Sequence, residues 1–281
     1  MFFKKLLLIL VLILICFATF MGCGDTSNGD TGGSALWYAK EQLSGKNIVF
    51  YGDSITAGHS TTGFSYNNSA QSQNSYPYLL TKEYGCGYRN YAVSGAKFTH
   101  SIAVSSNSAS GVQGIYEHEK DNKWADIVFI AYGTNDFTNC AEIGNLNLSA
   151  NSYDSVNTFA KAINFAVYTL KQHNPDVKIV FLTPLNRMKS NMPNHIYNHI
   201  TDLYLKEDFG ESIIERVRQL NEKGYDGDVI AIDMWDCFTK EEISPNTTYT
   251  VDGLHPNDLG HRKMADYIID YLENMVYSAN K

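Results

Sequence analysis

The chain has 281 residues, with 22 lysine and arginine side chains against 30 aspartate and glutamate side chains, and a formal net charge of −8 at pH 7. This acidic balance, without a basic patch, argues against nucleic acid or anionic lipid as a partner. Residues 35–281 suit one large domain or two small ones, and we predict one, because no linker or repeat divides them.

The first 22 residues have the pattern of an export signal. Lys4 and Lys5 precede an apolar run from Leu6 to Met21. This run is shorter than the roughly 18 to 20 residues that a membrane-spanning helix needs. The pattern favours a cleaved signal peptide, residues 1–22, over a permanent helix.

The four residues that end at Cys23, Phe-Met-Gly-Cys, resemble the lipobox of bacterial lipoproteins. The resemblance implies a lipid on Cys23 and a protein held on the extracytoplasmic side of the cell membrane. Phe20 stands where an aliphatic residue is usual, so an ordinary signal peptide and an uncleaved anchor stay open as alternatives. Residues 23–34 offer little to bury and predict a flexible tether. Residues 35–281 form the predicted domain.

Five short apolar runs rich in β-branched residues follow, at residues 46–51, 88–92, 126–132, 177–183 and 228–232. Nearly continuous hydrophobicity of this length is typical of strands that are buried on both faces of a parallel sheet. Segments with helical spacing alternate with them and follow them. The alternation predicts an α/β fold: a three-layer α/β/α sandwich, flavodoxin-like, with a central, mostly parallel sheet of five strands.

Two helices are the clearest in the pattern. The first is predicted over residues 156–170, where apolar side chains recur at helical spacing before Asn174-Pro175. The second is the last helix, marked by Leu259, Met264, Ile268 and Leu272.

Polar residues follow the first three predicted strands. Ser54 follows the first, Ser94-Gly95 the second and residues 133–136 the third, while Asp252 and His255 precede the last helix. Reactive groups of such sheets gather at the carboxyl ends of the strands. We therefore expect these residues to converge on one edge.

A serine hydroxyl needs a base, a group that orients the base, and donors for the developing oxyanion. Ser54 lies where a strand turns into a helix, so its backbone N–H can also face an oxyanion. Each residue has a plainer interpretation: Ser54 as an N-cap, Asp252 as a turn-former, and His255 as a loop histidine.

Four segments resemble the conserved blocks of the GDSL, or SGNH, hydrolase superfamily. They are Gly-Asp-Ser-Ile-Thr at 52–56, Asn-Tyr-Ala-Val-Ser-Gly-Ala at 90–96, Gly-Thr-Asn-Asp at 133–136 and Asp-Gly-Leu-His-Pro at 252–256. The resemblance implies a carboxylic ester hydrolase with Ser54 as nucleophile, His255 as base and Asp252 orienting the base. It also implies an oxyanion hole made by Ser54, Gly95 and Asn135. We predict no cofactor.

The remaining histidines are predicted to be ordinary surface or loop residues: His59, His100, His118, His173, His195, His199 and His261. One alternative is a zinc site, because His195 and His199 share a helical face if that segment is a helix. Ile196 replaces the glutamate of the H-E-x-x-H motif, and Pro193 is unfavourable for the helix. We predict no metal.

Three cysteines lie in the predicted domain, Cys86, Cys140 and Cys237. They are odd in number and widely spaced, so they form neither a disulfide framework nor a CxxC metal site. At most one pair could bridge.

The predicted tip loops, residues 60–75, 139–152 and 186–199, are polar, and the third carries Arg187, Lys189 and His195. With 19 tyrosines in the chain, they suit a sugar ring better than a lipid tail, although tyrosines also fill cores and surfaces. We expect a short acyl group, acetyl, on a carbohydrate. The alternatives are a glycan-binding protein without turnover and an acyltransferase that uses the same intermediate.

Overall fold

The computed structural model describes residues 43–66, 72–100, 109–147, 152–187, 205–225 and 227–279. The chain divides into two compact units, residues 1–33 and 34–281, and every described residue belongs to the second unit. The predicted signal peptide, Cys23 and the tether therefore lie outside the described residues. His195 and His199 do as well.

Five strands form one sheet in the order β2-β1-β3-β4-β5, and every neighbouring pair is parallel. Their bounds are β1 (Asn47–Gly52), β2 (Gly87–Asn90), β3 (Ile127–Ala131), β4 (Lys178–Leu182) and β5 (Val229–Ile232). The predicted five-stranded parallel sheet is confirmed. The second strand ends at Asn90, earlier than predicted, although the Tyr91 and Val93 N–H groups still donate to the Phe50 and Gly52 carbonyls of β1 at 2.8 and 3.0 Å.

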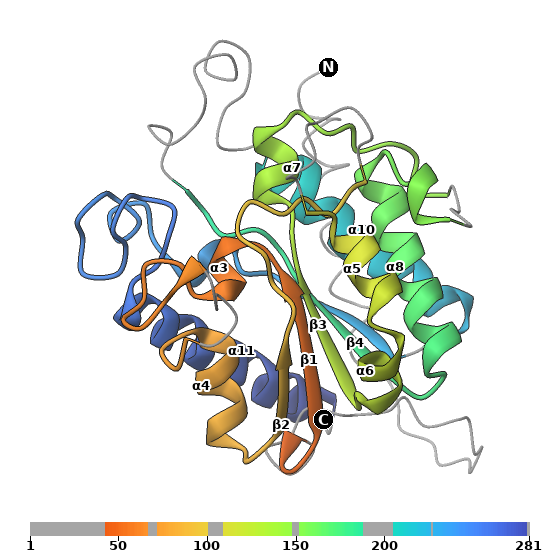
Figure 1. Ribbon diagram of the computed structural model, residues 1–281, viewed down its shortest axis with the longest axis horizontal. Coiled ribbons are helices and arrows are strands. Elements are labelled where there is room, and N and C mark those ends of the chain that lie inside the picture. The colour runs from red at the N-terminus through yellow and green to blue at the C-terminus, as the bar shows by residue number, and fades with distance from the viewer. Residues whose placement is uncertain are drawn as a thin grey trace, which may run out of the picture. The chain divides into compact units, whose positions relative to one another are not determined.

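Helices cover both faces of the sheet (Figure 1). On one face lie α4 (Tyr76–Glu83) and α11 (Asp258–Ala279), and on the other lie α5 (Gly111–Glu117), α6 (Glu119–Trp124), α8 (Phe159–His173) and α10 (Glu211–Leu220). In β1, Ile48 and Phe50 pack in the core with α4 and α11, while Val49 and Tyr51 pack in the core on the other face. The predicted three-layer sandwich is confirmed.

The remaining elements are short. Two four- or five-residue helices, α3 (Ser54–Ala57) and α7 (Thr134–Thr138), follow β1 and β3 directly. The others are the 3-10 turns η2 (Tyr153–Ser155) and η6 (Trp235–Cys237) and the π-helical turns η4 (Leu205–Gly210) and η5 (Asn221–Tyr225).

The two predicted helices are present, and the first of them starts later than predicted. Helix α8 begins at Phe159 rather than at 156, because Thr158 is extended and its side chain caps the Lys161 N–H. Helix α11 begins at Asp258, and Leu259 is 57% exposed, so it does not belong to the buried stripe. Within the described part of the chain, no helix has the length and the hydropathy needed to cross a bilayer.

The three cysteines of this unit are free thiols. Cys237 is buried, Cys86 is half-buried with its thiol donating to the Leu43 carbonyl at 3.1 Å, and Cys140 is exposed. None of the three pairs with another.

Gly52 ends β1 directly before the turn into α3. A Cβ at this position would lie 2.2 Å from Thr56 Oγ1 and 3.0 Å from the Ala131 carbonyl oxygen. We expect Gly52→Ala to lower the free energy of unfolding by about 1–3 kcal/mol, because α3 must move away from the sheet. Urea denaturation measures the change.

Gly114→Ala is the matched control, because nothing lies within 4 Å of its Cβ position inside α5. Alanine is the better helix former, so this variant should be as stable as the parent or more stable by up to about 1 kcal/mol. Equal effects of the two substitutions would contradict the role of the close approach at Gly52.

Candidate active site

The turn that carries Ser54 is formed by its neighbour. Asp53 is the N-cap of α3, and its side chain accepts the Ile55 N–H at 2.9 Å. Ser54 is therefore the first helical residue, not the cap, so its hydroxyl is not used for capping. The first N–H groups of a helix have no partner within it, which leaves the Ser54 N–H available to a bound group.

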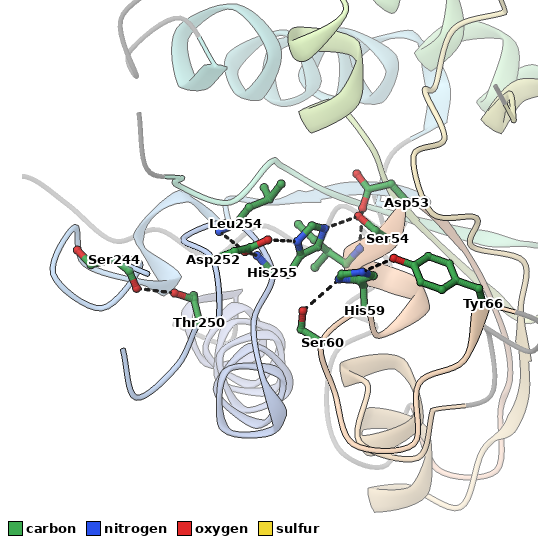
Figure 2. Close-up of polar contacts among 11 residues, drawn as sticks. Asp53, Ser54, His59, Ser60, Tyr66, Ser244, Thr250, Asp252, Leu254 and His255 are labelled. Carbon is green, nitrogen blue, oxygen red and sulfur yellow. Dashed lines mark hydrogen bonds and ion pairs between the residues drawn. The ribbon is translucent and has the colours of Figure 1, made fainter. Parts of the chain in front are cut away.

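Three predicted residues form a chain of hydrogen bonds (Figure 2). Ser54 Oγ lies 2.9 Å from His255 Nε2, and His255 Nδ1 lies 2.7 Å from Asp252 Oδ2. The serine side chain comes from the first residue of α3, just after β1, and the other two come from the loop before α11. The structure thus brings together residues that are about 200 positions apart in the chain.

The loop that carries the histidine is also held by Asp252. Its Oδ1 atom accepts the backbone N–H groups of Leu254 at 2.9 Å and His255 at 2.7 Å, and Gly253 between them has a φ of +79°. Only glycine adopts such a backbone without strain. Asp252 is therefore a turn-former, as one alternative held, and at the same time the partner of the His255 ring.

Asp252 is ionised at neutral pH. Partial burial alone would raise the pKa of its carboxyl group, but hydrogen bonds from the His255 backbone and ring outweigh burial and lower the pKa below its usual range. A charged acceptor holds the proton of the His255 ring on Nδ1, so Nε2 is free to accept a proton from Ser54.

The other predicted site residues lie around Asn135. Its side-chain amide donates to the Ala96 carbonyl at 3.0 Å and to Asp53 Oδ2 at 3.4 Å. These two acceptors are the direct neighbours of Gly95 and Ser54, so Asn135 lies between the other two predicted donors. Gly95 has a φ of +80°, and its N–H has no acceptor among the described residues.

Asp136 fixes the loop that follows Gly95. Its buried carboxyl accepts the backbone N–H groups of Phe98 at 2.8 Å and Thr99 at 3.1 Å and the Thr99 hydroxyl at 2.9 Å. Burial raises the pKa of Asp136 although these donors oppose the rise. Asp136 belongs to the third motif, but the sequence did not indicate this role.

Two histidines differ from their prediction as ordinary surface or loop residues. His261 lies fully buried in α11, where Nδ1 accepts the Tyr76 N–H at 3.1 Å and burial lowers its pKa to about 3. His59 is half-buried and its ring centroid lies 4.2 Å from that of His255. The only sequence signal for His59 was its position directly after the short helix of Ser54.

The third predicted tip loop begins with a buried side chain. Arg187 is 3% exposed and donates to the Thr138 hydroxyl at 2.9 Å and the Thr134 carbonyl at 3.4 Å. Its guanidinium group is therefore buried against α7, the helix that contains Asn135, and does not lie on the surface of a loop.

The described residues hold no group of three or more His, Cys, Asp or Glu side chains that could bind a metal ion. His195 and His199 lie outside them. The prediction of no zinc at that pair stays a prediction.

The fold and this arrangement define an α/β protein with a serine–histidine–aspartate site at the carboxyl edge of its sheet. The model of the GDSL-like lipase/acylhydrolase family matches residues 48–268. The chain therefore belongs to this family, whose members act on esters. No curated protein matches the chain.

Solved structures share the fold. A protein from Lactobacillus plantarum is 18% identical with a TM-score of 0.57, covering 82% of this chain and 98% of its own. A putative GDSL-like lipase from Bacteroides ovatus is 19% identical with a TM-score of 0.53 and covers 82% and 99%. A carbohydrate esterase, described as having divergent catalytic and non-catalytic binding functions at its active site, is 19% identical with a TM-score of 0.52 and covers 81% and 68%.

Burial of Asp53 makes the free energy of unfolding depend on pH. Burial raises its pKa to about 7, above the ~3.9 of an exposed aspartate. Between these values the folded protein keeps a proton that the unfolded chain releases, so folding becomes less favourable as pH rises from about 4 to about 7. Asp53→Asn keeps a capping side chain that does not ionise.

We therefore expect the free energy of unfolding of the parent to fall relative to that of Asp53→Asn across this range, as measured by urea denaturation at a series of pH values. Asp154→Asn, which removes an exposed carboxylate, is the control and should follow the parent. A difference between parent and Asp53→Asn that is constant with pH would refute the protonation of Asp53.

Proposed function

We propose that the protein is a serine ester hydrolase in which Ser54 is the nucleophile, His255 the general base and Asp252 the residue that orients the base. The observation that carries the proposal is the continuous chain of hydrogen bonds from Ser54 Oγ through the His255 ring to Asp252. His255 and Ser54 are mostly buried, at 14% side-chain and 7% residue exposure. Limited contact with water strengthens the interactions among these groups.

In the first step, Ser54 Oγ attacks the ester carbonyl carbon while its proton passes to His255 Nε2. The tetrahedral intermediate collapses, the alcohol oxygen takes the proton from His255, and the acyl group stays on Ser54. Water then attacks the acyl group, again giving a proton to His255, and the carboxylic acid leaves as Ser54 recovers its proton. Asp252 stabilises the imidazolium ring in both halves.

The negative oxygen of the tetrahedral intermediate needs donors that are already in place. We assign them to the Ser54 N–H, the Gly95 N–H and the Asn135 amide. The Asn135 bond to Asp53, at 3.4 Å, is longer than a usual N–H···O bond. This N–H can move to a charged oxygen without loss of the shorter bond to Ala96.

For the substrate we propose a short acyl group, acetyl, on a carbohydrate. Tyr66 supports the choice of a sugar: it is 72% exposed, and its hydroxyl is fixed by His59, which contacts His255 (Figure 2). The leaving alcohol must lie beside His255 to take its proton, and an exposed aromatic face there suits a sugar ring. The likeness to a carbohydrate esterase supports the fold alone.

A glycan-binding protein without turnover is the main alternative. Binding alone requires no aligned nucleophile, base and carboxylate, whereas all three are present and hydrogen-bonded here. Transfer of the acyl group to a sugar instead of water uses the same intermediate. Product analysis with glycan acceptors separates transfer from hydrolysis.

We also propose that the protein is exported and held on the extracytoplasmic side of the membrane by a lipid on Cys23, as the lipobox-like sequence suggests. Cys23→Ala should move the protein from the membrane fraction to the soluble fraction and abolish incorporation of a labelled fatty acid. Equal membrane association of parent and variant would favour an uncleaved anchor.

Replacing the nucleophile tests the mechanism. We expect the parent to hydrolyse p-nitrophenyl acetate and Ser54→Ala to lose about 10³-fold or more of kcat. Ser155→Ala, which removes an exposed hydroxyl outside the site, is the control and should retain full activity.

The chain-length preference tests the substrate. Acetate esters should be cleaved faster than butyrate and palmitate esters, and acetylated xylan or acetylated cell-wall glycan should release acetate. Selective cleavage of palmitate esters would contradict the acetyl assignment. Glycan binding that persists in Ser54→Ala, with no hydrolysis by the parent, would favour the binding protein.

A further inference from the structure

His59 is held next to the base by the same short helix that carries the nucleophile. Its backbone N–H donates to the Ser54 carbonyl at 2.9 Å, just beyond the left-handed Gly58 that ends α3. Its ring centroid lies 4.2 Å from that of His255 with a tilt of 47°. The two imidazoles are therefore in direct contact, and the backbone at Ser54 sets the position of both the nucleophile and His59.

Two neighbouring hydroxyl groups hold the His59 ring. Its Nε2 atom lies 2.7 Å from the Tyr66 hydroxyl and its Nδ1 atom 3.1 Å from Ser60 Oγ (Figure 2). The Phe64 ring adds an edge contact at 5.1 Å. Both nitrogens already have partners, so neither nitrogen of His59 competes for the proton of Ser54.

The contact favours one charge state of the pair. Partial burial lowers the pKa of His59, and the nearby His255 lowers it further, although Asp252 opposes both effects. Two imidazolium rings in contact repel each other. His59 is therefore neutral when His255 takes the proton from Ser54.

We propose that His59 is a positioning residue whose neutral ring supports the face of His255, keeps its Nε2 aligned with Ser54, and must be uncharged for turnover. The catalytic part of this inference rests on the proposed ester hydrolysis, whereas the support of the His255 ring does not. The titratable groups around His59 are His255 and Asp252 from the loop before α11, Tyr66 from its own loop, and Asp258 and His261 from α11.

Two substitutions of His59 distinguish the effect of its ring contact from the effect of its charge. His59→Ala removes the contact, and we expect kcat to fall about ten- to hundredfold with KM within about twofold, because the base loses its alignment. His59→Phe keeps a flat ring, and kcat should stay within about threefold of the parent. His173→Ala is the matched control: this histidine is also half-buried with a lowered pKa, but it ends α8 at the opposite edge of the sheet.

The pH profile supplies a readout that a purely structural role would not change. Because His59 must be uncharged for turnover, the fall of log(kcat/KM) at low pH should be steeper in the parent than in His59→Phe, whose ring cannot ionise. An equally steep fall in the two proteins would contradict the requirement for an uncharged His59. A circular-dichroism spectrum that is unchanged at the lowest pH used excludes acid unfolding as the cause.

A measurement without substrate keeps the inference separate from the proposed function. The ring proton on His255 Nδ1, held by Asp252, can be followed by NMR in protein with labelled histidine. It should be retained in the parent, His59→Phe and His173→Ala, and lost to exchange in His59→Ala. A parent that cleaves no ester would refute the proposed function, and this signal would still decide whether His59 supports His255.

Three results would overturn the role of His59. One is full activity and an unchanged NMR signal in His59→Ala. Another is an equal loss in His59→Ala and His59→Phe while both stay folded, because the ring contact would then not be the cause. The third is an equal loss in His59→Ala and His173→Ala.

Discussion

The pairing of β1 between β2 and β3 determines where the polar residues of the site lie. Gly52 of β1 is in register with Ala131 of β3, so these two strands end at the same level, and β2 ends at Asn90, opposite Phe50 of β1. The segments that leave them contain Ser54, Gly95 and Asn135. Side-chain packing on both faces of β1 fixes this register, because a shift by one residue would turn its buried side chains to the wrong layer.

Two buried carboxyl groups hold the loops that leave these strands in fixed positions. Asp53 caps the helix of Ser54 and meets the amide of Asn135, while Asp136 binds the loop that follows Gly95. Each of these groups is costly to bury, which is why burial raises the pKa of both carboxyl groups. The cost is offset by several backbone donors, and three loops from different strands are thereby fixed relative to one another.

Features that depend on a local sequence pattern could be predicted from the sequence. Continuous apolar runs predicted all five strands, because a strand buried on both faces has no polar alternation to obscure it. Four short motifs predicted which residues meet, since parallel strands bring their carboxyl ends to one edge. The start of α8 was less predictable, because it depends on a single side-chain bond, that of Thr158 to the Lys161 N–H.

The contacts of His59 and His261 were not predictable, because each has a partner far along the chain. His261 is buried against Tyr76, which lies 185 positions away, and nothing near either residue indicates the contact. The same holds for Arg187, which the polar sequence placed in a surface loop but which packs under α7. Packing between segments that are distant in the sequence determines the burial of such residues. Neither hydrophobic periodicity nor a short motif predicts that packing.

Two carboxyl groups close to Ser54 have opposite environments, and this difference assigns their functions. Asp53 is buried, and its pKa is raised to about 7, so near neutral pH it is partly protonated. It is therefore poorly suited to stabilise a cation. Asp252 is 44% exposed and hydrogen-bonded, and its pKa is lowered. It keeps its negative charge near neutral pH, so it can stabilise the imidazolium form of the proposed base, while Asp53 holds the turn that presents Ser54, the proposed nucleophile.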